Sequence, residues 1–332
     1  MRAIVTGSSG FIGSALSELL LNSGWAVLGI DSHTDFYSTE LKVRRLKKLQ
    51  THKNFKFFQM DVSDFPQMDR VIKEFLPISI FHLAAQAGVR ISTTELQKYV
   101  GSNLLGFASI LQAAVLNKVS NFLFASSSSV YGDTATIPYS ERELHLDPNS
   151  FYGATKLSNE ILAKSLIPGS STSARGMRFF TVYGPEGRPD MAYFRIISSL
   201  IEGSEFELFG DGTIERDFTY IDDCTKMIQL LEAELKVKSP GYFDIVNIGG
   251  GHPVSMNDLI ELTSKQIGKT FSFKVGKANA KDAKRTMANS EYLVSLVQEK
   301  PTTTIDEGIE KTVNWARSIT PGQLSSWVES SQ

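Results

Sequence analysis

The chain has 332 residues, of which 42% are hydrophobic and 21% are charged, and its net charge at pH 7 is −2. This composition belongs to a globular protein with a large core, and the small net charge gives no electrostatic reason to expect nucleic acid as a partner. Cys224 is the single cysteine, which excludes an intrachain disulfide and fits a reducing compartment. We find no signal peptide pattern and no apolar run of membrane-spanning length, so we expect a cytoplasmic protein without a membrane partner.

The first half of the chain alternates short apolar runs with helical patterns. Strands are predicted at 3–6, 26–30, 55–60, 78–83, 121–126 and 174–180. Helices are predicted between them at 11–21, 41–50, 67–76, 97–116 and 152–166. This alternation predicts βαβ units with right-handed crossovers, and therefore an α/β fold with a doubly wound parallel sheet of the Rossmann type.

Beyond residue 180, residues typical of turns become more frequent, and predicted strands and helices no longer alternate regularly. Helices are predicted at 193–201, 222–235, 256–266 and 305–319, and strands at 206–209 and 243–248. We expect Asp222 or Asp223 to cap the second of these helices, and 305–319 to be the last helix. The basic run 42–48 is interpreted as the solvated face of a helix.

A glycine-rich loop joins the first predicted strand to the first predicted helix. Gly7 permits a tight turn, Gly10 lets the backbone approach a pyrophosphate, and Gly13 lets the helix pack closely on the strand. The helix N-terminus, at Phe11 and Ile12, offers free N–H groups to phosphates. The loop therefore predicts a dinucleotide site, with a tight turn that binds nothing as the alternative.

Two acidic residues stand where a dinucleotide-binding fold contacts its ligand. Asp31 ends the second predicted strand, where a carboxylate would bind the adenosine ribose and repel a 2′-phosphate, so NAD is favoured over NADP. Asp61 and Val62 follow the third strand, at a position suited to the adenine edge. For Asp31 the alternative is a helix cap or turn residue, and for Asp61 a plain turn residue.

Tyr152 and Lys156 stand four residues apart, which is about one helical turn. A lysine ammonium beside a phenol favours the phenolate, and it would lower the pKa of the tyrosine from about 10 toward neutrality. Beside a nicotinamide, such a base indicates hydride chemistry at an alcohol carbon. The spacing alone also arises by chance, and an amphipathic tyrosine on an exposed helix is the alternative.

With these features in place, the chain resembles the extended short-chain dehydrogenase/reductases, and within them the nucleotide-sugar 4-epimerases, most specifically UDP-glucuronate 4-epimerases. The segments that carry the resemblance, besides the glycine loop and the tyrosine–lysine pair, are 82–90, 125–132, 178–185, 187–191 and 216–223. The resemblance implies NAD as the cofactor, and no metal site is expected.

The resemblance also assigns roles to individual residues. It makes Ser127 the hydroxyl that completes a catalytic triad with Tyr152 and Lys156. The residues that would flank the cofactor are Leu83, Ala84 and Ala85. The residues that would face the nucleotide sugar are Arg90, Ser127, Ser128, Thr181, Arg188, Arg216 and Asp282. Arg216 suits a diphosphate, and Arg90 and Arg188 suit a phosphate or a uronate carboxylate, with a surface salt bridge as the alternative for each arginine. The stretch 280–283 departs from the family pattern around Asp282.

Two serines after Ser127 bear on which reaction is catalysed. The related 4,6-dehydratases carry an Asp-Glu pair after the catalytic hydroxyl, and decarboxylases of UDP-glucuronate typically carry a glutamate where Ser129 stands. Since serines do not easily replace a carboxylate as a general base, we expect C4 epimerisation of a UDP-sugar, most of all UDP-glucuronate to UDP-galacturonate. The alternatives are a UDP-glucose/UDP-galactose 4-epimerase, a UDP-glucuronate decarboxylase and a non-catalytic NAD-binding regulator.

The same resemblance suggests a domain division and an assembly. We expect an NAD-binding domain at 1–180 plus about 217–249, and an interwoven nucleotide-sugar-binding domain at 181–216 and 250–330. The predicted helices 97–116 and 152–166 carry apolar residues on more than one face. This pattern favours a homodimer through a helix bundle, as relatives form.

Overall fold

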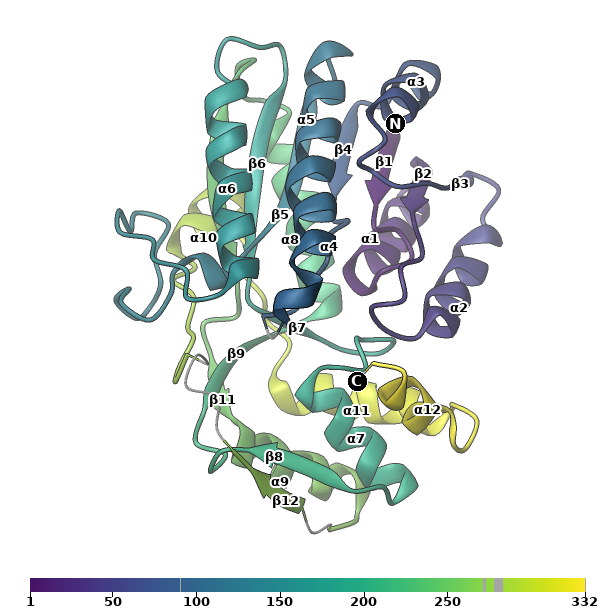
Figure 1. The fold of residues 1–332 in the computed structure, drawn as a ribbon, viewed down its shortest axis with the longest axis vertical. Coiled ribbons are helices and arrows are strands. Elements are labelled where there is room, and N and C mark those ends of the chain that lie inside the picture. The colour runs from purple at the N-terminus through teal and green to yellow at the C-terminus, as the bar shows by residue number, and fades with distance from the viewer. Residues whose placement is uncertain (90, 271–272, 278–282, 332) are drawn as a thin grey trace.

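A seven-stranded parallel sheet forms the upper half of the molecule (Figure 1). The computed structural model describes residues 1–89, 91–270, 273–277 and 283–331. The strands of the large sheet, in spatial order, are β10 (Phe243–Ile248), β6 (Ser173–Phe179), β5 (Asn121–Ser127), β4 (Ser79–His82), β1 (Arg2–Thr6), β2 (Ala26–Asp31) and β3 (Phe55–Gln59). The predicted doubly wound fold is confirmed. The strand order reverses between β1 and β4, and ligands of such sheets bind at the carboxyl ends of the strands there.

Helices cover both faces of this sheet because successive strand residues alternate between two cores. Ile4 packs with α3 (Phe65–Phe75), α5 (Gly106–Leu116) and α6 (Phe151–Leu166). Its neighbours Ala3 and Val5 pack with α1 (Phe11–Asn22), α2 (Thr39–Gln50) and α8 (Ile221–Leu235) on the other face. A strand buried on both faces reads as a continuous apolar run, which is how these strands were recognisable in the sequence.

The lower half of the molecule holds two small sheets and several helices (Figure 1). One sheet contains β7 (Thr181–Tyr183), β9 (Glu215–Tyr220) and β11 (Pro253–Ser255), and the other contains β8 (Phe206–Phe209) and β12 (Phe273–Gly276). The helices of this half are α7 (Ala192–Glu202), α9 (Met256–Ile267), α11 (Ile305–Arg317) and α12 (Gln323–Glu329), whereas α10 (Glu291–Val297) contacts α8 and β10 beside the large sheet. Between these elements, α8 and β10 return to the large sheet, so the chain passes repeatedly between the two halves.

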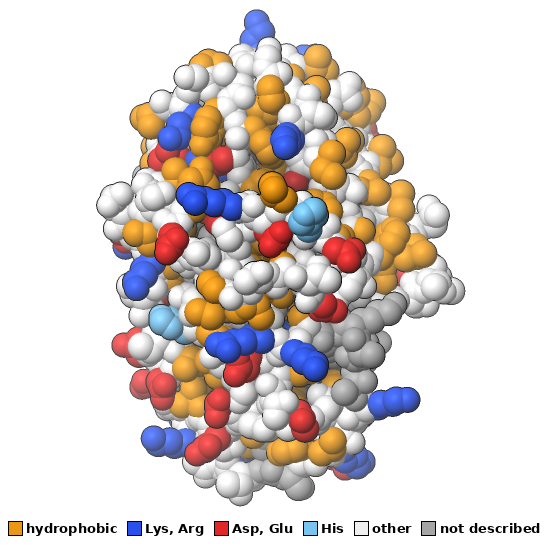
Figure 2. Space-filling model, turned by 90° about the vertical axis from the view of Figure 1, so that its left-hand side faces the viewer, with side chains coloured by type: hydrophobic (Ala, Val, Ile, Leu, Met, Phe, Trp, Pro, Cys, Tyr) orange, Lys and Arg blue, Asp and Glu red, His pale blue; other side chains and the backbone are white. Residues whose placement is uncertain are grey.

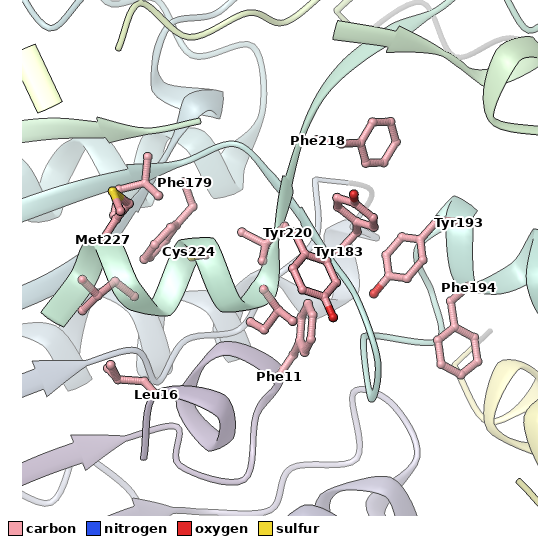
Figure 3. Close-up of a cluster of buried hydrophobic side chains, with 14 of the residues drawn as sticks. Phe11, Leu16, Phe179, Tyr183, Tyr193, Phe194, Phe218, Tyr220, Cys224 and Met227 are labelled. Atoms are coloured by element: carbon pink, nitrogen blue, oxygen red, sulfur yellow. The ribbon is translucent and has the colours of Figure 1, made fainter. Parts of the chain in front are cut away.

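One continuous core joins the halves. Figure 3 shows Phe11 of α1 beside aromatic side chains of the lower half, with Tyr183 of β7 at the centre. The Tyr183 ring lies 6.0 Å from Tyr193 and 5.7 Å from Phe218 and Tyr220, centroid to centroid, in edge-to-face arrangements that aromatic pairs prefer. The loop that follows β7 is therefore anchored against both halves.

The segment predicted as one helix at 97–116 is irregular in the structure. A short helix α4 (Leu96–Tyr99) leads into a π-helical segment, Val100–Leu105, before α5 begins. Contrary to the sequence expectation, the stretch Thr93–Leu116 is long and apolar enough to cross a bilayer by length and composition. Half of its apolar window is buried within the fold, and the core helix of a globular protein passes the same test.

Two further expectations about helices are wrong. Helix α8 begins at Ile221, so Asp222 and Asp223 lie in its first turn and Tyr220 occupies the cap position. The Asp223 carboxylate instead accepts the backbone N–H groups of Thr302 and Thr303, at 2.9 and 2.7 Å. Helix α11 is not the last helix, because α12 follows it.

The surface seen in Figure 2 carries acidic and basic side chains interspersed with hydrophobic ones.

Candidate active site

The glycine loop forms a cradle that only glycines can build. Gly7 has a φ of +69°, and a Cβ there would lie 2.8 Å from the backbone nitrogen of Ala84. A Cβ on Gly13 would lie 2.0 Å from the Gly7 carbonyl oxygen. Gly10 occupies the cap position of α1 and offers no side-chain bond to the helix N–H groups, so the positive end of the helix at Phe11 and Ile12 is open to a phosphate. This geometry fits the pyrophosphate of a dinucleotide.

Asp31 lies beside this loop at the end of β2. Its carboxylate accepts the backbone N–H of Ser9 at 3.0 Å and that of His33 at 2.8 Å. Asp31 therefore acts as a turn residue, which was the sequence-based alternative to a ribose-binding role. A carboxylate has about four acceptor positions, so Asp31 retains the capacity to bind ribose hydroxyls as well.

The other predicted cofactor residues follow β3 and β4. Asp61 is exposed and accepts the N–H of Ser63 at 2.8 Å, as a turn aspartate does, while Val62 is buried against the α5 side of the sheet. The chain at Leu83, Ala84 and Ala85 runs beside the glycine loop, since the Ala84 N–H donates to the Thr6 hydroxyl at 3.2 Å. The Thr6 hydroxyl also bonds to His82, whose pKa burial lowers to about 3, so this histidine is neutral.

The three predicted catalytic side chains meet at the carboxyl edge of the sheet. Helix α6 starts after Ser150, whose hydroxyl accepts the N–H of Gly153 at 3.1 Å, and this start places Tyr152 and Lys156 on successive turns. The Lys156 ammonium lies 5.8 Å from the centre of the Tyr152 ring and donates to the Ala125 carbonyl at 2.9 Å. Ser127, at the end of β5, lies close enough to Tyr152 for its hydroxyl to lower the pKa of the phenol.

The pKa of Tyr152 differs from the sequence expectation. Burial raises it above its ordinary value, and the charge of Arg188 and the Ser127 hydroxyl oppose this only in part. Burial also lowers the pKa of Lys156 from 10.5 to about 8. The expectation that Lys156 draws the pKa of Tyr152 toward neutrality is therefore wrong for the chain by itself, because the desolvation of both groups disfavours their charged forms.

The predicted substrate residues come from separate elements of the chain. Ser128 opens a 3₁₀ turn directly after Ser127, and Thr181 begins β7. Arg188 forms a bidentate ion pair with Asp190, at 3.0 and 2.6 Å, and its charge acts on Tyr152. Arg216 of β9 donates to the carbonyls of Glu215 and Ala283, at 2.9 and 2.7 Å. Arg90 and Asp282 lie outside the described residues.

One residue near the site escaped the sequence interpretation. The run 42–48 was taken as a solvated face, but Lys42 is 5% exposed and Arg45 is 1% exposed. The Arg45 guanidinium donates to the carbonyl of Ser9 in the glycine loop at 3.1 Å. The signal was present in the spacing, because Arg45 stands four residues after Leu41 and four before Leu49, on the apolar side of α2.

Comparisons with known proteins agree with this geometry. The family described as "NAD dependent epimerase/dehydratase family" matches residues 3–249. A UDP-glucuronate 4-epimerase of Thermodesulfobacterium geofontis is 38% identical over 316 residues, which cover 95% of this chain and 95% of that protein. A probable UDP-glucuronate 4-epimerase of Rhizobium meliloti is 35% identical over 329 residues, with 95% and 96% covered.

A solved structure is also similar over almost its whole length. It is a UDP-glucuronic acid 4-epimerase from Bacillus cereus in complex with UDP-glucuronic acid and NAD, which is 34% identical with a TM-score of 0.88, covering 96% of this chain and 99% of that one. The resemblance to nucleotide-sugar 4-epimerases is thereby confirmed. Because the family match includes the glycine loop, Ser127 and the tyrosine–lysine pair, this chain belongs to the NAD-dependent epimerase/dehydratase family.

Proposed function

We propose that the protein epimerises a UDP-sugar at C4 with NAD, and that it converts UDP-glucuronate to UDP-galacturonate through a 4-keto intermediate. The observation that carries the proposal is the convergence of Ser127, Tyr152 and Lys156 beside a glycine cradle that fits a dinucleotide. The choice of UDP-glucuronate is supported by relatives that bear the name of this activity.

The proposed division of labour assigns proton transfer to the chain. NAD, when bound, supplies the acceptor and donor of the hydride at C4. Tyr152 takes the proton of the C4 hydroxyl, and Ser127 holds the C4 oxygen by a hydrogen bond. Because burial raises the pKa of Tyr152, its phenolate depends on nearby cations. The charge of Arg188 lowers this pKa in the chain by itself. We assign the same role in the loaded site to the Lys156 ammonium, which lies 5.8 Å from the centre of the Tyr152 ring. Tyr152 returns the proton after the sugar has presented its other face.

The serines after Ser127 favour epimerisation over elimination or decarboxylation. The Ser127 hydroxyl donates to that of Ser129 at 3.2 Å and accepts the Ser129 N–H at 3.2 Å. Ser129 therefore supports the catalytic hydroxyl, and it supplies no carboxylate at the place where a decarboxylase typically has one. Neither Ser128 nor Ser129 can act as the general acid or base that elimination requires near neutral pH.

Arginines are the proposed ligands of the charged parts of the substrate. The ion pair of Arg188 with Asp190 uses Nε and one Nη, so the other Nη is the group that we assign to a uronate carboxylate or a phosphate. Arg216 is assigned to the diphosphate, with Thr181 beside the sugar. We also retain Arg90 as a candidate ligand on its residue type alone.

We further propose a cytoplasmic homodimer that pairs α5 and α6 with their copies. The apolar side chains on this surface are 39 to 60% exposed, and they are Leu105, Leu116, Ile161, Leu162 and Leu166. Pairing these helices in a four-helix arrangement would cover them. Light scattering tests this point, because a particle with the mass of a single chain would contradict it.

The deciding experiment offers UDP-glucuronate and UDP-glucose separately to the purified, NAD-loaded protein and identifies the products by NMR. UDP-galacturonate supports the proposal, whereas its absence contradicts it. UDP-galactose alone would identify the neutral-sugar epimerase, and carbon dioxide with a UDP-pentose would identify the decarboxylase. Tyr152→Phe is the control for chemistry, since a regulator that only binds NAD would keep its biological effect in that variant.

A further inference from the structure

Arg45 is a buried cation whose donors all point at neutral oxygens. Its Nη1 donates to the Ser9 carbonyl at 3.1 Å and to the Tyr37 hydroxyl at 2.7 Å. Its Nε and Nη2 donate to the Glu186 carbonyl at 3.1 and 2.5 Å, and Nη2 also donates to the Gly187 carbonyl at 3.0 Å. A guanidinium has five N–H donors in a rigid fork, and these five bonds use all of them.

The carbonyls that Arg45 binds belong to two loops that serve the two ligands. Ser9 lies in the glycine loop, and its N–H and hydroxyl are fixed by Asp31 and His33, at 3.0 and 2.8 Å. Glu186 and Gly187 lie in the loop from β7 to α7, directly before Arg188. Arg45 therefore links the glycine loop to the loop between β7 and α7, which carries Arg188, the cation whose charge acts on Tyr152.

The geometry of the second loop depends on this link. Glu186 has a φ of +56°, a left-handed conformation that is strained for a residue other than glycine. This conformation turns its carbonyl to the guanidinium, which binds it twice. Because burying a cation without a carboxylate is unfavourable, its full hydrogen bonding to two loops implies a role that a hydrophobic side chain could not fill.

We propose that Arg45 is a positioning residue that couples the dinucleotide site to the sugar site. A bound dinucleotide adds its own contacts to the glycine loop and so restrains the Ser9 carbonyl further. The guanidinium then holds Glu186 and Gly187, and Arg188 stays in place beside Tyr152. The inference rests on the proposed function, since it assumes that the second loop serves a UDP-sugar. Coupling of this kind is reciprocal, so a ligand of the sugar site must tighten the cofactor site by the same factor.

The test measures NADH affinity by fluorescence titration of nucleotide-stripped protein, with and without saturating UDP. In the unmodified chain UDP is expected to tighten NADH binding by about fivefold or more, the lower end of typical allosteric couplings. In Arg45→Met this factor is expected to fall to within about twofold of one. Arg44→Met is the matched control, because Arg44 is an exposed neighbour that pairs with the Glu186 carboxylate at 3.4 Å and leaves the carbonyl link intact.

If Arg45→Met does not fold, Arg45→Lys is the second variant for the same measurement. It keeps the charge but offers a point donor that cannot bridge both loops, so its coupling factor is also expected to fall. A folded Arg45 variant with the coupling factor of the unmodified chain overturns the inference, and so does an unmodified chain in which UDP binds but leaves NADH affinity unchanged. A chain that does not bind UDP at all would instead refute the proposed function, so the two failures are distinguishable.

Discussion

Replacing Lys156 with methionine is expected to stabilise the fold while it abolishes activity. The Lys156 side chain is 2% exposed, and its ammonium donates to the Ala125 carbonyl. Burial lowers its pKa from 10.5 to about 8. A shift of this size corresponds to about 3 kcal/mol of folding free energy lost by keeping the charge in place, since one pKa unit corresponds to about 1.4 kcal/mol.

The sign of the effect fixes its pH dependence. Below about pH 8 the lysine is protonated in both the folded and the unfolded chain, so the full destabilisation is present. As the pH rises from about 8 to 10.5, the folded chain loses this proton before the unfolded chain does, and the destabilisation disappears. The stability gained in Lys156→Met is therefore largest near pH 7 and smallest near pH 10.

Urea unfolding of the nucleotide-stripped protein, followed by circular dichroism at pH 7 and pH 10, measures this difference. Lys164→Met is the matched control, because Lys164 is exposed on the same helix and its replacement is expected to change stability by less than about 0.5 kcal/mol. The reasoning is refuted if Lys156→Met is less stable than the unmodified chain at pH 7, or if its gain is the same at both pH values.

Three further predictions concern chemistry, the cradle and the packing behind the site. Tyr152→Phe is expected to retain NAD but to lose at least about a hundredfold in turnover, measured by NMR of the product, and near-normal turnover would contradict its role as the base. Gly13→Ala is expected to lose NAD, followed by the absorbance of bound nucleotide, because its Cβ would lie 2.0 Å from a carbonyl oxygen. Gly101→Ala is its control, since a Cβ there meets nothing within 4 Å and NAD retention should persist. Glu160→Ala is expected to destabilise the fold by about 3–5 kcal/mol, measured by urea unfolding. The reason is that the buried Arg178 guanidinium, which Glu160 binds at 2.9 and 2.7 Å, loses its carboxylate partner. A loss below about 1 kcal/mol would show that this charge is solvated by other means.

The sequence alone was enough to predict the features that depend only on residues close together in the chain. The strand–loop–helix around Gly7, Gly10 and Gly13 could be predicted because a tight turn and a close helix–strand contact each require glycine at a fixed offset. The parallel sheet could be predicted because strands buried on both faces are continuous apolar runs separated by helical patterns. The pairing of Tyr152 with Lys156 followed from the pitch of a helix.

Short elements of the lower half were harder to recognise. Strands β7 and β11 have three residues each, too few for an alternating pattern to stand out. Strand β9 (Glu215–Tyr220) overlaps the segment 216–223, and only the family resemblance marked residues 216–220 in the sequence. These strands are stabilised by pairing with segments distant in the chain, and such pairing leaves little local signal.

Only the tertiary structure decided the electrostatics of the site. The raised pKa of Tyr152 depends on how completely other segments exclude water from it, and no spacing along the chain reports that exclusion. Arg45 looked like part of a solvated basic run until the carbonyls of Ser9 and Glu186, which lie far from it in sequence, were placed around it. The sequence by itself therefore determined which groups are present and which local geometry they adopt, whereas their charge states and partners arose only when distant segments packed together and removed water.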